Sequence, residues 1–120
     1  MNYAEFINEI RTSIPVSLEI DKFINEWGDD LPVMLFGEIG RSIAINLSVL
    51  SKNDRQYIFT CIKEGMVNGE EILKSYIATG LLESMYNTSQ ETQNWVDIKK
   101  DLDSESLKYI NAWINFDSKP

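Results

Sequence analysis

The chain has 120 residues, 43% of them hydrophobic and 25% charged, which are the proportions of an ordinary globular domain. Its 19 acidic and 11 basic side chains give a formal net charge of −8, which disfavours nucleic acid and anionic membrane surfaces as partners because both attract clustered cations. The sequence contains no His, so catalysis that depends on a histidine acid or base is excluded.

Apolar residues recur at helical spacing from the start of the chain, and proline and glycine mark the predicted helix ends. A first helix is predicted over residues 3–13, because Pro15 disfavours helix in the residue before it. Ser17 is a candidate cap for a second helix. Gly28 ends that helix, since glycine is the residue type that most easily adopts a left-handed conformation.

The third segment, residues 33–50, is the most apolar and predicts a central helix with Asp29 or Asp30 as its cap. Gly37 and Gly40 lie inside it, where each glycine costs about 0.5–1 kcal/mol relative to Ala. Their presence predicts that another helix comes close at this place.

The second half of the chain predicts four further helices separated by polar turns. The longest of them ends near Asn87, where Asn87-Thr88-Ser89 breaks the apolar pattern. The four helices are expected to start at Ser51 or Asn53, at Glu70, near Trp95 and at Asp103-Ser104.

No segment alternates convincingly as a strand, so we expect an all-α fold. The prediction is a single compact domain over residues 1–120 with about six or seven antiparallel helices, arranged as a bundle or a short stack of helical hairpins. Only residues 117–120 are expected to form a loose tail.

The single cysteine and the lack of targeting signals bear on location. Cys61 lies in an apolar stretch and is predicted to be a core residue of a protein in a reducing compartment. The chain start has no signal-peptide pattern, and no apolar run approaches the ~20 residues that span a bilayer. We therefore expect a cytoplasmic protein.

Carboxylates are the remaining candidates for chemistry, because phosphate-binding loops, dinucleotide-binding glycines and Cys/His metal spacings are missing from the sequence. Glu38 and Glu83, each inside an apolar helix, are the natural pair for binding a cation or for acid–base work. However, Glu-x-x-His elements are impossible here, and Arg41 is spaced to form a local ion pair with Glu38. We predict structural roles for both glutamates, no metal, no cofactor and no enzyme activity.

The distribution of charge is more informative than any motif. Residues 19–38 carry one base, Lys22, against six acids: Glu19, Asp21, Glu26, Asp29, Asp30 and Glu38. One interpretation is a solvated helix face with capping aspartates, and the other is a docking surface for a cationic protein. A second acidic group is partly neutralised by Lys99 and Lys100 and comprises Asp97, Asp101, Asp103 and Glu105.

Trp27 stands beside this acidic turn. Tryptophan is enriched at the energetic centres of protein interfaces, but most aromatic side chains belong to the core. Both interpretations stay open from the sequence. If the docking interpretation holds, the predicted partner-binding residues are Glu19, Asp21, Glu26, Trp27, Asp29 and Asp30.

Two runs, EWGDDLPVMLFGEIGR at residues 26–41 and IATGLLESM at residues 77–85, together with Trp113, give the chain a distinctive pattern. With these runs it resembles a family of small, acidic, all-helical bacterial proteins similar to the immunity proteins of contact-dependent inhibition and polymorphic toxin systems. The resemblance implies a cytoplasmic protein that binds one cognate toxin domain, in many cases a nuclease with a basic groove, and covers its active site.

Two other hypotheses compete with an inhibitor. A helical adaptor or regulatory module would recognise another helix through an apolar groove, and an exposed stripe of Leu, Met and Phe would favour it. A carboxylate-based metal enzyme would require a stoichiometric divalent ion in the purified protein.

Overall fold

A computed structural model describes residues 1–117, and every regular element in them is helical. The elements are α1 (Tyr3–Ile10), α2 (Ile14–Trp27), α3 (Pro32–Asn46), the 3₁₀ turn η1 (Leu47–Val49), α4 (Lys52–Asn68), α5 (Glu71–Ser75), the π-helix η2 (Tyr76–Leu82), α6 (Glu83–Thr92), α7 (Trp95–Asp101) and α8 (Ser104–Asp117). Because α5, η2 and α6 follow one another without a break, residues 1–117 form seven helical rods. The all-α prediction is confirmed. The predicted tail begins at Asp117, the last residue of α8, and its other residues, 118–120, lie outside the described residues.

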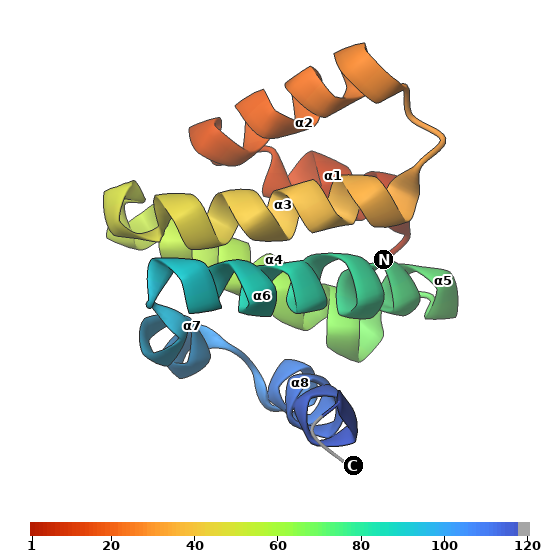
Figure 1. Cartoon of the computed structure of the whole chain (residues 1–120). Helices are drawn as coiled ribbons and strands as arrows, with labels where there is room; N and C mark the ends of the chain where they lie inside the picture. The colour runs from red at the N-terminus through yellow and green to blue at the C-terminus, as the bar shows by residue number, and fades with distance from the viewer. Residues whose placement is uncertain (118–120) are drawn as a thin grey trace.

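Successive long helices run antiparallel, as their short connections require. Figure 1 shows α2 on one side of α3 and the rod α5–η2–α6 on the other, with α4 behind them. The closest pair, α3 and the rod, is parallel, because α4 lies between them in the chain and carries it back. One hydrophobic core links all these layers, and its largest fully buried side chains include Phe6, Phe36 and Ile58.

Glycines set the distance between α3 and the rod. A Cβ built on Gly40 would lie 2.2 Å from the carbonyl oxygen of Leu81, and a Cβ on Gly80 would lie 2.8 Å from the carbonyl oxygen of Val33. The predicted close approach of another helix is therefore confirmed at Gly40, whereas a Cβ on Gly37 would make only ordinary contacts, the nearest at 3.9 Å. The close approach also lets the Ser84 hydroxyl donate to the Gly37 carbonyl at 2.6 Å.

Several helix ends fall where the sequence predicts them. The Ser51 side chain caps α4 by accepting a hydrogen bond from the Asp54 amide at 3.1 Å. Gly28 follows α2 with a φ of 84°, a conformation in which other residues are strained. Gly28 thereby turns the chain sharply out of α2.

Other predicted ends are wrong. The first helix stops at Ile10, and α2 starts at Ile14 with Pro15 in its first turn, where proline is tolerated. Ser17 thus lies inside α2, and Ser13 occupies the cap position. The central helix ends at Asn46, four residues early, in the 3₁₀ turn η1.

The predicted break at Asn87-Thr88-Ser89 does not occur, because α6 continues to Thr92. The hydroxyls of this stretch bond to the backbone of their own helix. Ser89 donates to the Tyr86 carbonyl at 2.6 Å, and Thr92 donates to the Thr88 carbonyl at 3.2 Å. Polar side chains satisfied in this way can be buried inside a helix.

Cys61 is buried in the core, as predicted. Burial, together with the nearby charge of the Glu9 carboxylate, raises the pKa of its thiol to about 11. Two tryptophans, Trp95 and Trp113, pack edge-on against Tyr86 at ring distances of 5.0 and 5.8 Å.

Candidate functional site

A groove between α2 and α3 brings together half of the predicted partner-binding residues. The two helices diverge toward the loop 28–31 (Figure 1), and the groove occupies about 480 Å³ along their length. Ser84 of α6 lies at its floor. The other residues that line this α2–α3 groove are Glu19, Lys22, Phe23, Glu26 and Trp27 of α2 and Met34, Gly37, Glu38 and Arg41 of α3.

Helical spacing explains why these residues of α2 line the groove. Glu19, Lys22, Glu26 and Trp27 are separated by three, four or one residues, so they share one side of α2. Asp21 falls outside this spacing, and its carboxylate pairs with the Arg11 guanidinium at the end of α1. The structure therefore removes Asp21 from the groove.

The groove carries mixed charge. Three acids, Glu19, Glu26 and Glu38, line it together with Lys22 and Arg41, so Arg41 adds a second base to the one counted in residues 19–38. The predicted ion pair between Glu38 and Arg41 is wrong, since it is not among the ion pairs of residues 1–117. Arg41 is exposed and Glu38 is half-buried, and an ion pair between side chains that water still reaches gains little, so both side chains are available to a partner.

Trp27 is exposed rather than part of the core. Its relative accessibility is 54%, and the neighbouring Met34 is 52% exposed. The core interpretation of Trp27 is therefore wrong. A large apolar surface lies open in the groove, with carboxylates beside it.

Acidic residues of α6 continue this surface. A second hollow of about 420 Å³ lies between α3 and the rod, and it shares Gly37, Arg41 and Ser84 with the α2–α3 groove. Glu83 and Glu91 line it. Sequence reasoning missed Glu91, although the spacing of Glu83, Asn87 and Glu91 by four residues signals a common stripe on α6.

Asp29 and Asp30 lie apart from the groove. They follow Gly28 in the loop and line a different hollow, which also contains Tyr3 and Tyr76. Neither aspartate caps α3, because Leu31 occupies the cap position and no side chain bonds there. The capping role predicted for them is therefore wrong.

Glu83 has a structural partner. The Tyr109 hydroxyl of α8 donates to its carboxylate at 2.5 Å, and burial together with this bond raises the pKa of Tyr109 well above its usual value. Glu83 therefore ties α8 to the rod. Within residues 1–117, no cluster of three or more His, Cys, Asp or Glu side chains is arranged to hold a metal ion.

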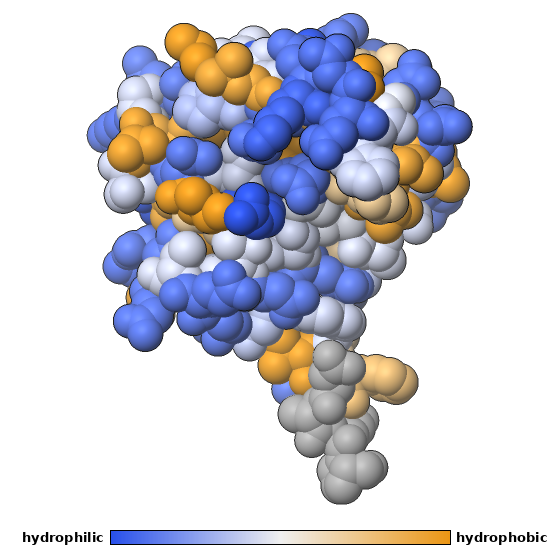
Figure 2. Space-filling model, turned by 45° about the horizontal axis from the view of Figure 1, so that its top comes forward, coloured by the Kyte–Doolittle hydropathy of each residue, from blue (hydrophilic) through white to orange (hydrophobic). Residues whose placement is uncertain are grey.

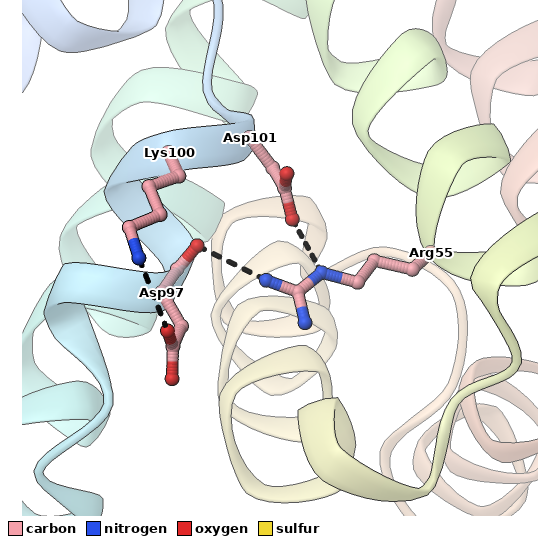
Figure 3. A network of polar contacts seen from close by, with 4 residues as sticks. All are labelled: Arg55, Asp97, Lys100 and Asp101. Carbon is pink, nitrogen blue, oxygen red and sulfur yellow. Dashed lines mark hydrogen bonds and ion pairs between the residues drawn. The ribbon is translucent and has the colours of Figure 1, made fainter.

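The second acidic group is largely occupied within the chain. Figure 3 shows Arg55 of α4 reaching α7, where its guanidinium bonds to the Asp101 carboxylate and donates to the Asp97 carbonyl at 3.1 Å. Lys100 pairs with the Asp97 carboxylate at 3.9 Å. These contacts join α4 to α7, so this group is less available to a partner than the acids of the groove.

The face that carries α2 is mixed in hydropathy. Figure 2 shows hydrophobic areas interleaved with hydrophilic ones on this side of the molecule. Apolar side chains exposed on α2 and α3 include Ile14, Leu18, Trp27 and Met34. A partner bound here would meet apolar and charged groups side by side.

Comparison with known proteins returned no matching family model, no matching curated protein and no matching solved structure. Within the part of the chain that the structure describes, no helix combines the length and apolar character needed to cross a bilayer.

Proposed function

We propose that this protein is an immunity protein that binds a cationic toxin domain through the α2–α3 groove and covers the toxin's active site. The observation that carries the proposal is the exposed Trp27 in an open groove with Glu19, Glu26 and Glu38 beside it. The resemblance of residues 26–41 and 77–85 to immunity proteins supports the same function. In this role the protein acts by occupying a surface, without cofactor and without catalysis of its own.

The chemistry of the groove suits a basic protein surface. A partner's lysine or arginine side chains meet three carboxylates there, and the net charge of −8 accelerates the encounter. Trp27 supplies a rigid apolar area of the kind that dominates interface energetics, where loss of an anchor residue costs about 2 kcal/mol or more. Arg41 and Lys22 also lie in the groove, so a matching partner surface must present hydrogen-bond acceptors or carboxylates to these two bases.

If the proposal holds, the gene directly upstream of this chain's gene should encode a large secreted protein that ends in a small basic domain, and that domain is the partner for the test. An unrelated gene at this place would count against the proposal. We expect co-expression of the chain to rescue growth of cells that produce this domain. Purified chain is expected to bind it with salt-sensitive affinity. Trp27→Ala and Glu26→Lys should weaken binding by about tenfold or more.

Glu64→Lys is the matched control. Glu64 is exposed near the end of α4 as Glu26 is near the end of α2, so both variants change the charge equally at similar helix positions. If Glu26→Lys and Trp27→Ala bind the basic domain as well as Glu64→Lys does, the groove is not the binding surface. If the unaltered chain neither rescues growth nor binds the basic domain, the immunity function itself is contradicted.

A helical adaptor is the second candidate, and one observation favours it. Ile14 and Leu18 are spaced by four residues on α2 and are 72% and 63% exposed, so they form an apolar pair outside the groove. In an adaptor, Leu18→Glu would abolish partner binding, whereas Glu26→Lys would leave it unchanged. The two functions therefore give opposite results with the same pair of variants.

A further inference from the structure

A small hollow at one end of the molecule combines aromatic walls with two carboxylates. It lies where the N-terminus, the loop 28–31 and α5 come together (Figure 1) and occupies about 320 Å³. This is the lower end of the size range of ligand sites, suited to a single side chain rather than a large cofactor. The residues that line this tyrosine pocket are Tyr3, Asp29, Asp30, Pro32, Ile72 and Tyr76.

The aromatic walls are held firmly. The Tyr3 ring stacks on Phe36 at 5.8 Å and meets Tyr76 edge-on at 5.9 Å, with an interplanar angle of 80°. Phe36 is fully buried and also contacts the Tyr76 ring at 5.7 Å. The two tyrosines are therefore anchored on the core while their outer surfaces border the pocket.

The backbone around the pocket is also fixed. The Glu70 amide donates to the Met1 carbonyl at 3.0 Å, which joins the N-terminus to the start of α5. Asn2 and Glu5 form a reciprocal capping box at the start of α1. A site built on these elements needs little ordering when a ligand binds.

The carboxylates of the pocket are not neutralised by the rest of the chain. The acids that form ion pairs in residues 1–117 are Asp21, Glu71, Asp97 and Asp101, and neither Asp29 nor Asp30 is one of them. Asp29 lies close enough to Tyr3 to act on its phenol, since burial and the charge of Asp29 both raise the pKa of Tyr3. Both aspartates are exposed and both line the pocket.

Aromatic faces attract cations through the ring quadrupole, and carboxylates bind them by charge-assisted hydrogen bonds. An anion would be repelled here, and a neutral apolar group would leave the carboxylates without a partner. Guanidinium satisfies both features at once, because it is planar enough to stack on a tyrosine ring and presents paired N–H groups to a carboxylate. Ammonium offers only a compact charge.

We propose that the tyrosine pocket is a recognition site for an arginine side chain on the surface of a partner protein. This site is separate from the α2–α3 groove, and it adds a defined residue type to the proposed binding of a basic protein. It does not require that the partner be a toxin.

The test is an NMR titration of the full chain with N-acetyl-arginine amide. The corresponding lysine and citrulline amides, which have side chains of similar length, are the comparison ligands. Citrulline keeps the planar shape of arginine and lacks its charge. We expect arginine amide to shift the backbone amides of Tyr3, Ile72 and Tyr76, with weaker shifts from lysine amide and none from citrulline amide. High salt should reduce the arginine shifts.

Two variants with equal charge change locate the site. Asp29→Asn with Asp30→Asn should weaken arginine binding by about tenfold, whereas Glu64→Gln with Glu105→Gln, at exposed carboxylates outside both the groove and the pocket, should leave it within about twofold. Circular dichroism of both variants checks that they fold.

Three results would overturn the proposal: arginine shifts spread over the whole acidic surface, shifts insensitive to the two aspartates, or lysine binding as strong as arginine binding. If arginine amide does not bind the pocket but the partner protein still binds through the α2–α3 groove, only the arginine site is rejected. Binding of arginine amide in the pocket by a chain that rescues no toxin would reject only the immunity function.

Discussion

The contact between α3 and the rod provides the sharpest test of the fold. In Gly40→Ala, the new Cβ would lie 2.2 Å from the Leu81 carbonyl oxygen and 3.1 Å from the Met85 amide nitrogen. Both are backbone atoms that cannot rotate away, so the helices must separate by about 1 Å to restore ordinary van der Waals contact. Every apolar side chain between them would then lose part of its packing.

The size of the effect follows from two opposing terms. Overpacking of this kind costs about 3 kcal/mol, the upper part of the usual range, and the better helix propensity of Ala returns about 1 kcal/mol. The expected net loss is therefore about 2 kcal/mol in the free energy of unfolding, or about 8 °C in the melting temperature of a domain of this size. Urea denaturation followed by circular dichroism measures it.

Gly37→Ala is the internal control. It lies three residues earlier in the same helix, but its new Cβ would be 3.9 Å from the Gly80 carbonyl oxygen and 4.0 Å from the Ser84 Cβ, which are ordinary contacts. We expect this variant to be as stable as the unaltered chain or more stable by up to about 1 kcal/mol. Equal stability of the two variants would refute the close packing of α3 against the rod.

Four further predictions concern the same contact, the junction of α4 and α7, and Cys61. Gly80→Ala would bring a Cβ within 2.7 Å of the Phe36 Cβ, so we expect a loss of about 2 kcal/mol in the same denaturation assay. Arg55→Lys cannot reproduce the guanidinium's contacts with α7, such as that with Asp101, and should cost about 0.5–1 kcal/mol, with a smaller cost at high salt. The pKa of Cys61, raised to about 11 from 9, leaves on the order of 100-fold less thiolate at pH 8 than in the unfolded chain, and a chromogenic thiol reagent should report this as a correspondingly slow reaction. The raised pKa favours the protonated thiol in the folded state. The contribution of this thiol to the free energy of unfolding is therefore complete below pH 9 and disappears as the pH rises through 11. Denaturation at these pH values measures the loss.

Local signals predicted much of the fold. The cap at Ser51, the helix end at Gly28 and the close contact at Gly40 each depend on chemistry within a few residues of the chain. The break expected at Asn87-Thr88-Ser89 failed because hydroxyl groups can bond to their own helix when the surrounding packing favours continued helix. Gln93 ends α6 with a φ of 58°, a position where the usual glycine signal is missing.

The π-helix η2 could not be predicted from the sequence either. Its residues have no distinctive composition, and the segment packs where Gly40 approaches the Leu81 carbonyl and Gly80 approaches α3. A π turn carries one more residue per hydrogen-bonded turn than an α turn, so its occurrence depends on how the neighbouring helix meets the backbone. That information lies in tertiary packing, not in local propensity.

Counting acids along the chain was a poor guide to the candidate site, because neighbours in sequence point to different sides. Glu19 and Glu26 are seven residues apart, two helical turns, and share the groove, whereas Asp21 lies between them in sequence and pairs with Arg11. The exposure of Trp27 was not readable from its surroundings in the sequence. Trp27 is the last residue of α2 and is 54% exposed, at the end of the helix where α2 diverges from α3 toward their connecting loop (Figure 1).

That loop separates the two candidate surfaces. On one side of residues 28–31 Trp27 enters the α2–α3 groove, and on the other side Asp29 and Asp30 border the tyrosine pocket. A basic protein seated over the loop would therefore contact both hollows at once, each combining an aromatic surface with carboxylates. Exposed carboxylates mainly raise the rate of encounter, whereas buried aromatic contacts mainly slow dissociation. For such a partner, the presence of both kinds of group on each side of one short turn, where Gly28 has a positive φ, would combine fast encounter with slow dissociation.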